Sequence, residues 1–441
     1  MYLKLNIERT EKFMLASFLL LKIYLLYIKI GQPIGFDAKP YIRVFRDTHW
    51  FQALPSIREY VYAYHPPLAP LIQRFISAFG FDPIYSSQIF SFICIIGSFF
   101  AFRAILKKIG LLDKFCGVAF LYLAFSLPVF IFMTYEIGND APVFLFANIV
   151  LYLSVFLFWD KKIKKDRNNI DRLVMIFLML VISASMLVKY TGFLNIFIPF
   201  FVILVRGTKK DLIRNIVLAV LIAILSISLV FPFYYYRYYK SEKSFFPVNA
   251  DWIIESRGIA EEVEKRREKK LLYIAKNMIR IPRESFYLAN EPVRDSFFHS
   301  IWFQTWKLDK RAEEQGKASS IFSNIYLTIF FALMLLGTVS FGLFFGGRDP
   351  TWNSLGGLLV CVGLLFAFGM IFYGFKYPLW SWIIFKSKYM APSLLWISYS
   401  TVTFLMDIPS IFTKLKMRHI EHVSLICIFV FMVINHVLPV Y

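Results

Sequence analysis

Long apolar runs recur along most of this 441-residue sequence, and each is about 17 to 22 residues long. A helix of about 20 apolar residues crosses the roughly 30 Å hydrocarbon layer of a bilayer. The composition agrees, with 58% hydrophobic residues and a mean hydropathy of +0.59. These features exclude a soluble chain and predict an all-α polytopic membrane protein. The eleven predicted spans cover 13–30, 86–106, 115–133, 141–159, 173–188, 191–205, 214–233, 321–345, 353–374, 389–406 and 423–440.

The 49 basic residues against 29 acidic ones predict an orientation and not a nucleic-acid partner. If the N-terminus is cytoplasmic, the cytoplasmic segments carry 20 Lys and Arg residues, and the short external segments carry only 8. The positive-inside rule therefore predicts a cytoplasmic N-terminus and an external C-terminus. The first span lacks a small-residue cleavage site, so we expect it to stay as an anchor.

Two predicted external segments are too long to be simple connectors. The segment 31–85 contains seven prolines, and its stretches 39–53 and 67–79 have helix-like apolar spacing, which predicts short helices on the membrane surface. The segment 234–320 holds 17 basic and 13 acidic residues with many i,i+4 pairs, which predicts a small helical external domain. The predicted organisation is an N-terminal segment with the first span (1–30), an external loop (31–85), six spans (86–233), an external helical domain (234–320) and four spans (321–441).

The first candidate site lies directly after the first span, in Gly35 to Tyr41. Asp37 at the outer membrane boundary could accept a proton from a hydroxyl nucleophile. A solvated aspartate that turns the chain before Pro40 is the alternative interpretation.

The second candidate is His65, which precedes Pro66 and could present its ring to a cleft. An incidental histidine at a helix start explains the same pattern.

The third candidate is the turn from Tyr135 to Pro142, at the outer end between two spans. Glu136, Asn139 and Asp140 place two carboxylates and an amide at the membrane boundary, which is costly unless they are paired or solvated. Asp140 is also a proper start for the following helix, because it precedes Ala-Pro. Both interpretations stay open on the sequence alone.

The fourth candidate is basic. Lys189 and Tyr190 lie between the fifth and sixth spans, and Lys386, Lys388 and Tyr389 precede the tenth span. All are predicted at the outer face, where the positive-inside rule makes cations uncommon. Cations at this face could hold a lipid phosphate. Lysines that extend along the lipid to reach water are the alternative for either cluster alone.

Taken together, these segments resemble the GT-C superfamily of integral membrane glycosyltransferases, in particular its protein O-mannosyltransferase and aminoarabinose transferase-like branch. The matching elements are an acidic residue after the first span, a His-Pro-Pro-Leu segment, an Asn-Asp pair before a later span, a Lys-Tyr-Thr-Gly turn and a basic motif before a late span. In this sequence they are Asp37, His65 to Leu68, Asn139-Asp140, Lys189 to Gly192 and Lys386 to Tyr389. The chain departs from the pattern at Ala38, where the family often has a second acidic residue, and at Lys388, where it usually has arginine.

The resemblance implies a GT-C fold and an inverting transfer of a sugar from a polyprenyl-phosphate donor to a hydroxyl or phosphate acceptor on a lipid, glycan or protein. It implies Asp37 as the catalytic base, with Glu136 and Asp140 as candidates for a second acidic role. The implied substrate-binding residues are Tyr41, His65, Asn139, Lys189, Tyr190, Lys386, Lys388 and Tyr389. No pattern demands a metal, although Asp37, Glu136 and Asp140 could gather a divalent cation.

Two other classes of function compete with the transferase. A transporter or lipid flippase would use Lys22, Lys29, Lys189 and Asp407 along a path through the membrane. A membrane glycan polymerase or ligase of another family would also fit long external segments. Most candidate charge is predicted at the outer face beside these segments, which favours the transferase.

Overall fold

The computed structural model describes the helical body of the chain, and the statements below concern these residues. The described residues are 6–34, 38, 42–43, 65–159, 168–206, 211–246, 258, 261, 332–333, 335–340, 342, 348–376, 391–411 and 417–437. They form helices, turns and short connections, and this part of the chain contains no strand. The predicted all-α membrane architecture is therefore confirmed.

Helices coincide with every predicted span except 321–345, which falls largely outside the described residues. The helices are α1 (Ile7–Lys29), α3 (Leu68–Ser77), α4 (Pro83–Lys108), α5 (Phe115–Phe125), α6 (Pro128–Phe132), α7 (Asp140–Phe158), α8 (Asn168–Val188), the 3-10 helix η2 (Tyr190–Phe197), α9 (Ile198–Arg206), α10 (Leu212–Tyr234), the π-helical turn η4 (Tyr235–Tyr239), α11 (Lys240–Glu242), α18 (Pro350–Lys376), α20 (Ala391–Ile411) and α21 (Met417–Val437). Of the external segment 31–85, the helix predicted at 67–79 is present as α3, whereas 39–53 lies almost wholly outside the described residues.

Six of these helices are individually long and apolar enough to cross a membrane: α4, α7, α8, α10 with its extension, α18 and α21. Two predicted spans are divided. The third breaks at Ser126 and Leu127, because Pro128 begins a new short helix and has no backbone N–H to continue the old one. The sixth starts as the 3-10 helix η2 and continues as α9.

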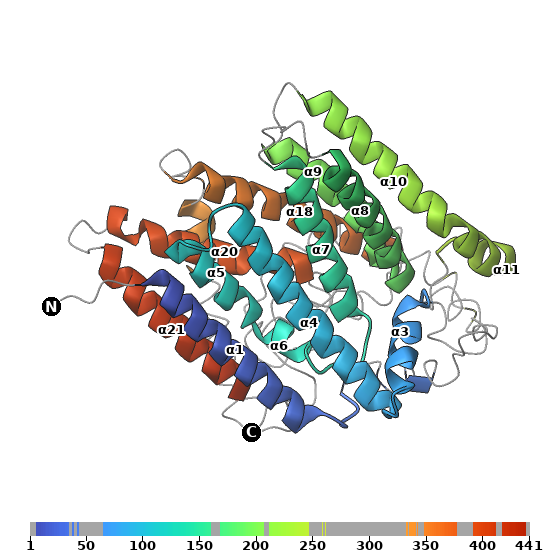
Figure 1. The fold of residues 1–441 in the computed structure, drawn as a ribbon, viewed down its shortest axis with the longest axis horizontal. Coiled ribbons are helices and arrows are strands. Elements are labelled where there is room, and N and C mark those ends of the chain that lie inside the picture. Colours follow the sequence, from blue (N-terminus) through green and yellow to red (C-terminus); the bar gives the residue numbers. More distant parts are fainter. Residues whose placement is uncertain are drawn as a thin grey trace.

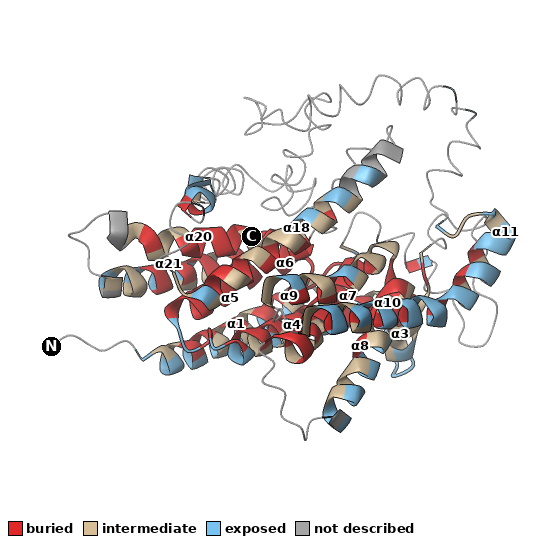
Figure 2. Ribbon diagram, turned by 90° about the horizontal axis from the view of Figure 1, so that it is seen from above, coloured by how far each residue is buried: buried red, intermediate tan, exposed pale blue. Residues whose placement is uncertain are grey.

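The helices pack around α5, in which every residue is buried. α4 runs along α7, α7 packs on α8 and α9, and α18 pairs with α20, while α20 and α21 cover α5 and α1 lies along α21 (Figure 1). Buried residues concentrate along the middle of this bundle, and exposed ones lie on its outer helices, α8 and α10 among them (Figure 2). Exposed apolar side chains on these helices, such as Ile213, Phe177 and Leu225, suit contact with lipid.

Three charged contacts join helices at one end of the bundle. The guanidinium of Arg103 donates to both carboxylate oxygens of Glu11, at 2.8 and 3.1 Å, and so ties α4 to α1. Lys114 forms an ion pair with Asp349, which connects the start of α5 to the start of α18. By the sequence prediction this end is cytoplasmic.

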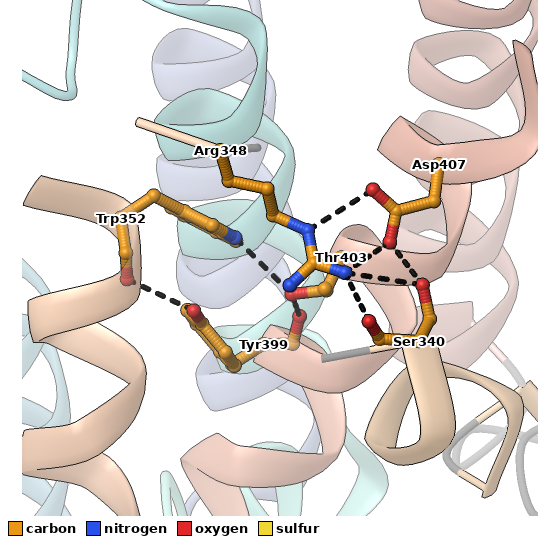
Figure 3. Close-up of polar contacts among 6 residues, drawn as sticks. All are labelled: Ser340, Arg348, Trp352, Tyr399, Thr403 and Asp407. Atoms are coloured by element: carbon orange, nitrogen blue, oxygen red, sulfur yellow. Dashed lines mark hydrogen bonds and ion pairs between the residues drawn. The ribbon is translucent and has the colours of Figure 1, made fainter. Parts of the chain in front are cut away.

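The third contact is the buried network drawn in Figure 3. Arg348 pairs with Asp407 of α20 and donates to Ser340, and Ser340 also donates to Asp407. Beside it, the indole of Trp352 donates to Thr403 at 3.1 Å and stacks on Tyr399, with 4.5 Å between ring centroids (Figure 3). These contacts fix α18 against α20.

Candidate active site

The predicted site residues that the structure describes gather at the opposite end of the bundle. There α1 ends, α4 and α7 begin, and α8 passes into η2. Gln88 on α4 holds this arrangement together, and it is fully buried. Its side-chain oxygen accepts from the N–H of Gly31 at 2.8 Å, and its amide nitrogen lies 2.9 to 3.1 Å from the carbonyl oxygens of Lys29, Gln32 and Tyr135.

Gly31 is required at the end of α1. Its φ of +84° favours glycine, and a Cβ atom there would lie 2.9 Å from the hydroxyl oxygen of Tyr85. The chain therefore turns sharply out of α1 and against α4. The first predicted external segment starts from a fixed position at this end of the bundle.

The turn before α7, Tyr135 to Asp140, which we name the acidic turn, packs against the chain where it leaves α1. The N–H of Ile137 donates to the carbonyl of Ile34 at 2.9 Å, and the hydroxyl of Ser91 donates to the carbonyl of Glu136 at 2.7 Å. Glu136, Asn139 and Asp140 are all buried. The turn is thus built into the protein and is not a loose hairpin in solvent.

Asp140 forms an ion pair with Lys189, and both side chains are buried. Asp140 opens α7, and Lys189 occupies the position before η2. The pair joins two turns that lie 49 residues apart in the sequence. The sequence predicted that these residues share a face of the membrane, and the structure adds that they contact each other.

η2, which directly follows Lys189, lies in close contact with α8. The hydroxyl of Ser185 donates to the carbonyl of Gly192 at 3.0 Å, and a Cβ atom on Gly192 would lie only 2.0 Å from the carbonyl oxygen of Ser185. Only glycine fits at this position. It therefore fixes how closely η2 lies against α8 and where Lys189 stands.

Tyr190 enters an aromatic cluster next to this pair. Its ring lies 6.2 Å from that of Tyr234, 6.1 Å from that of Tyr238 and 5.6 Å from that of Phe246. The hydroxyl of Tyr234 donates to the carbonyl of Met186 at 2.7 Å. The far end of α10 is thereby attached to the site.

His65 is half-buried, and Pro67 immediately precedes the first residue of α3, so the predicted helix start is present. Asp37, Tyr41, Lys386, Lys388 and Tyr389 lie outside the described residues. Ala38, the residue after Asp37, is buried and packs in one cluster with Ile42 and Ile137. No group of three or more His, Cys, Asp or Glu side chains that could hold a metal occurs among the residues with described positions.

The sequence prediction missed Gln88 and Ser91, which position the site. Their only signal is that α4 carries several buried polar side chains inside an otherwise apolar span, among them Ser86, Ser87 and Ser98. Lys22, predicted on an inward face, is fully buried. Its ammonium donates at 2.8 Å to the hydroxyl of Thr134, the residue that immediately precedes the acidic turn.

Comparison with solved structures identifies the fold. The apo crystal structure of the Archaeoglobus fulgidus oligosaccharyltransferase superposes with a TM-score of 0.51 at 12% sequence identity, over 95% of this chain and 56% of that chain. The apo structure of ArnT from Cupriavidus metallidurans gives a TM-score of 0.42 at 11% identity, over 91% of this chain and 80% of that chain. No family profile and no curated protein matches the sequence. The expected GT-C fold is confirmed, and the chain spans a little over half the length of the oligosaccharyltransferase.

Proposed function

We propose that this protein is an inverting glycosyltransferase of the membrane. It moves a sugar from a polyprenyl-phosphate donor to a hydroxyl or phosphate acceptor on a lipid, glycan or protein, at the external face. The observation that carries this proposal is the gathering of the acidic turn, Lys189 and the chain leaving α1 at one end of the bundle. The fold shared with an oligosaccharyltransferase supports the same class of reaction.

In this proposal Asp37 is the base. The next residue, Ala38, packs against Ile137 of the acidic turn, which supports this assignment. Asp37 accepts the proton of the acceptor hydroxyl while its oxygen attacks the anomeric carbon. The bond from that carbon to the phosphate oxygen breaks on the opposite side, so the anomeric configuration inverts.

Lys386 and Lys388 are the proposed cations for the departing phosphate. Lys189 adds positive charge, but the carboxylate of Asp140 balances most of it. Tyr41, His65, Asn139, Tyr190 and Tyr389 are the proposed substrate contacts. One observation supports Asn139 as a substrate contact: its side-chain nitrogen is buried and has no hydrogen-bond partner in the described part of the chain. If a divalent cation takes part, Asp37, Glu136 and Asp140 are the proposed ligands.

A transport path is less well supported. Of the charges that it would use, Lys189 and Asp407 stand at opposite ends of the bundle, and each is held in an ion pair. Lys22 donates to the neutral acceptors Thr134 and Phe130. These contacts support a role for the charges in holding helices together, and not in lining a continuous polar path through the membrane.

The test is transfer by the purified protein in lipid nanodiscs that contain lipid-linked sugars extracted from membranes. Formation of a glycosylated acceptor together with free polyprenyl phosphate supports the proposal, and NMR of the product reports whether the anomeric configuration has inverted. The Asp37→Asn protein is the matched control. Movement of the intact lipid-linked sugar across the bilayer without cleavage would instead establish a flippase.

A further inference from the structure

Two fully buried polar side chains at the end of the bundle that carries the acidic turn make no hydrogen bond within the part of the chain that the structure describes. They are Gln73 of α3 and Ser87 of α4. Both amide atoms of Gln73 lack a partner there, and so does the hydroxyl of Ser87. Most buried polar groups in proteins are paired, because burial without a partner costs free energy. A role for these atoms therefore has to be sought.

Ser87 lies on the face of α4 that meets the acidic turn. Ile84, Ser87 and Ser91 are three and four residues apart, so they share one face of the helix. Ile84 packs against the apolar cluster that contains Ile137, and the hydroxyl of Ser91 donates to the carbonyl of Glu136. Ser87 therefore stands between two contacts with the acidic turn, beside the candidate active site.

The hydroxyl of Ser87 also departs from the usual behaviour of serine inside a helix. A helical serine can donate to the carbonyl one turn earlier, which satisfies its hydroxyl without any other partner. On the same helix, the hydroxyl of Ser98 donates to the carbonyl of Cys94 at 2.7 Å. On α7, the hydroxyl of Ser154 donates to the carbonyl of Val150 at 2.7 Å. Among the described residues Ser87 makes no such bond, so its hydroxyl is available to a ligand.

α3 brings Gln73 to the same region. α3 and α4 form a helical hairpin across the turn 78–82, in which Gly80 has a positive φ (Figure 1). Gln73 and Ser87 are equally far from Gly80 along the chain, which places them at a similar level of the hairpin. Gln73 and Ala69 are four residues apart and both fully buried, so this face of α3 points inward. α3 packs on α4 and α8, and these two helices also pack on α7, which the acidic turn precedes.

The unpaired atoms match a ligand with several hydroxyls. The amide of Gln73 offers an acceptor oxygen and a donor nitrogen, and the hydroxyl of Ser87 can donate and accept. In the acidic turn, the side-chain nitrogen of Asn139 adds another buried donor without a partner among the described residues. All three side chains are uncharged. They therefore suit neutral hydroxyls better than a phosphate, which gains most from cations.

We propose that Gln73 and Ser87 bind hydroxyls of the donor sugar and so orient its anomeric carbon toward the proposed base. This inference rests on the proposed function and deepens it. The donor is the occupant because it always presents a sugar ring with several hydroxyls. The proposed acceptor need present only the group that reacts, and it need not be a sugar.

Entry of the sugar requires a movement, because Gln73 and Ser87 are both fully buried. The ring reaches them when α3 shifts relative to α4. α3 suits such a shift, since it has only ten residues and no side-chain cap at its start. The closed arrangement leaves polar atoms without partners, and the bound sugar supplies those partners.

A packing defect without function is the alternative interpretation. Asn215, near the start of α10 and away from the acidic turn, is also buried, and its side-chain oxygen has no partner in the described chain. An unpaired amide alone therefore does not make a site. Under either interpretation, an apolar side chain of similar size removes the cost of burying the amide and should keep or raise the unfolding temperature. Only the binding role predicts that donor affinity falls at the same time.

The experiment measures binding to the full-length protein in nanodiscs, with polyprenyl phosphate and with the same lipid carrying a single glucose, mannose or galactose. Gln73→Met keeps the length of the side chain and removes its amide. Gln73→Met and Ser87→Ala should each bind the preferred sugar-bearing lipid about three- to tenfold more weakly than wild type, the effect of one lost hydrogen bond. Neither variant should change the affinity for polyprenyl phosphate. Asn215→Leu is the matched control and should keep wild-type affinity for both lipids.

Donors that each lack one hydroxyl identify the contact. Wild type should bind one donor of this deoxy series more weakly than the parent sugar, by a similar factor. Gln73→Met should bind that deoxy donor and the parent equally, because the side chain and the hydroxyl belong to one interaction. Losses that simply add would show that Gln73 does not contact that hydroxyl, and additivity across the whole series would overturn the inference.

Two further results would overturn the inference. Unchanged donor affinity in both variants would indicate a packing defect, or an acceptor site if the KM for the acceptor rises instead. Equal weakening of the sugar-bearing and sugar-free lipids would indicate a general effect on the fold or on the lipid site. If wild type binds none of the sugar-bearing lipids, the proposed function itself fails, and this outcome is distinct from equal binding by wild type and variants.

Discussion

Asp140 and Lys189 form a buried ion pair that joins the start of α7 to the start of η2. Neither charge faces bulk water, and each neutralises the other. Removal of one partner would leave an uncompensated charge in a protein interior, which commonly costs about 3–5 kcal/mol. The pair is therefore a structural requirement of the site, whatever else its members do.

We first predict a less than additive cost when both partners are replaced. Asp140→Asn and Lys189→Met should each lower the free energy of unfolding by about 3–5 kcal/mol. The double variant should lose less than the sum by about 1–3 kcal/mol, because no unpaired charge is left. Unfolding in detergent, followed by circular dichroism, measures the four proteins. Simple additivity would mean that the two charges do not interact in the folded protein.

The second prediction concerns the proposed base. Asp37→Asn keeps the shape of the side chain but cannot accept a proton, so turnover should fall by about 10²–10⁴-fold. Donor binding should persist, since other residues hold the phosphate. The comparison variants are Glu136→Gln and Asp140→Asn. Near-normal turnover in Asp37→Asn, with loss in Glu136→Gln or Asp140→Asn protein that circular dichroism shows to be folded, would move the base to the acidic turn.

Third, we predict that Lys388→Ala raises the apparent KM for the lipid donor and lowers kcat, because the phosphate gains negative charge as it leaves. Combination with Lys189→Ala should cost less than the sum of the two single changes if both lysines act on one phosphate. Lys376→Ala, at the end of α18, is the control. Steady-state kinetics with wild-type values in the double variant would show that these lysines do not contact the donor.

The fourth prediction is the orientation. Single cysteines at Ser56 and Ser256, in a background without the four native cysteines, should react with an impermeant maleimide added from outside intact cells. Both positions belong to segments that are predicted external on charge grounds. Labelling only after the membrane is opened would reverse the topology and place the proposed site on the cytoplasmic side.

The fifth prediction is a pH window for the contact between Lys114 and Asp349. The ammonium of Lys114 holds the pKa of Asp349 below its usual range, and the carboxylate raises the pKa of Lys114. Because the pKa of Asp349 is lowered, the contact stabilises the fold above about pH 4, and this contribution is lost as the pH falls further. Because the pKa of Lys114 is raised, the contact also stabilises the fold below about pH 10, and this contribution is lost as the pH rises further. Asp349→Asn should therefore lower stability slightly, by no more than about 1 kcal/mol for such a partly exposed pair, and only between these limits. Unfolding temperatures at pH 3, 7 and 11 measure the effect, and an equal difference at all three would contradict it.

The positions of the helices could be predicted from the sequence because their signals are local. An apolar run of about 20 residues must bury its own backbone hydrogen bonds in the bilayer, so each predicted span with described residues is helical. The turns at 134–140 and 189–192 are predictable for the same reason, since charged and flexible residues interrupt the runs there. The same residues were predicted at one face of the membrane from the alternation of spans.

Contacts between distant segments could not be predicted in this way. Helical periodicity does not state which helix a face meets, so neither the pairing of Asp140 with Lys189 nor the four contacts of Gln88 follows from spacing. The break at Ser126 and Leu127 and the π turn at Tyr235–Tyr239 depend on packing against neighbours as well as on nearby proline.

Local patterns in the sequence are enough to predict that the chain crosses the membrane many times, where its helices lie, and which charged turns share one face. Two features follow only from the packed bundle: Lys189 neutralises Asp140, and Gln88 and Ser91 of α4 fix the acidic turn. The physical reason is that apolar burial in lipid acts on each segment separately. Ion pairs and amide contacts depend instead on the depth and rotation of two helices relative to each other, and these quantities are set only when the whole bundle packs.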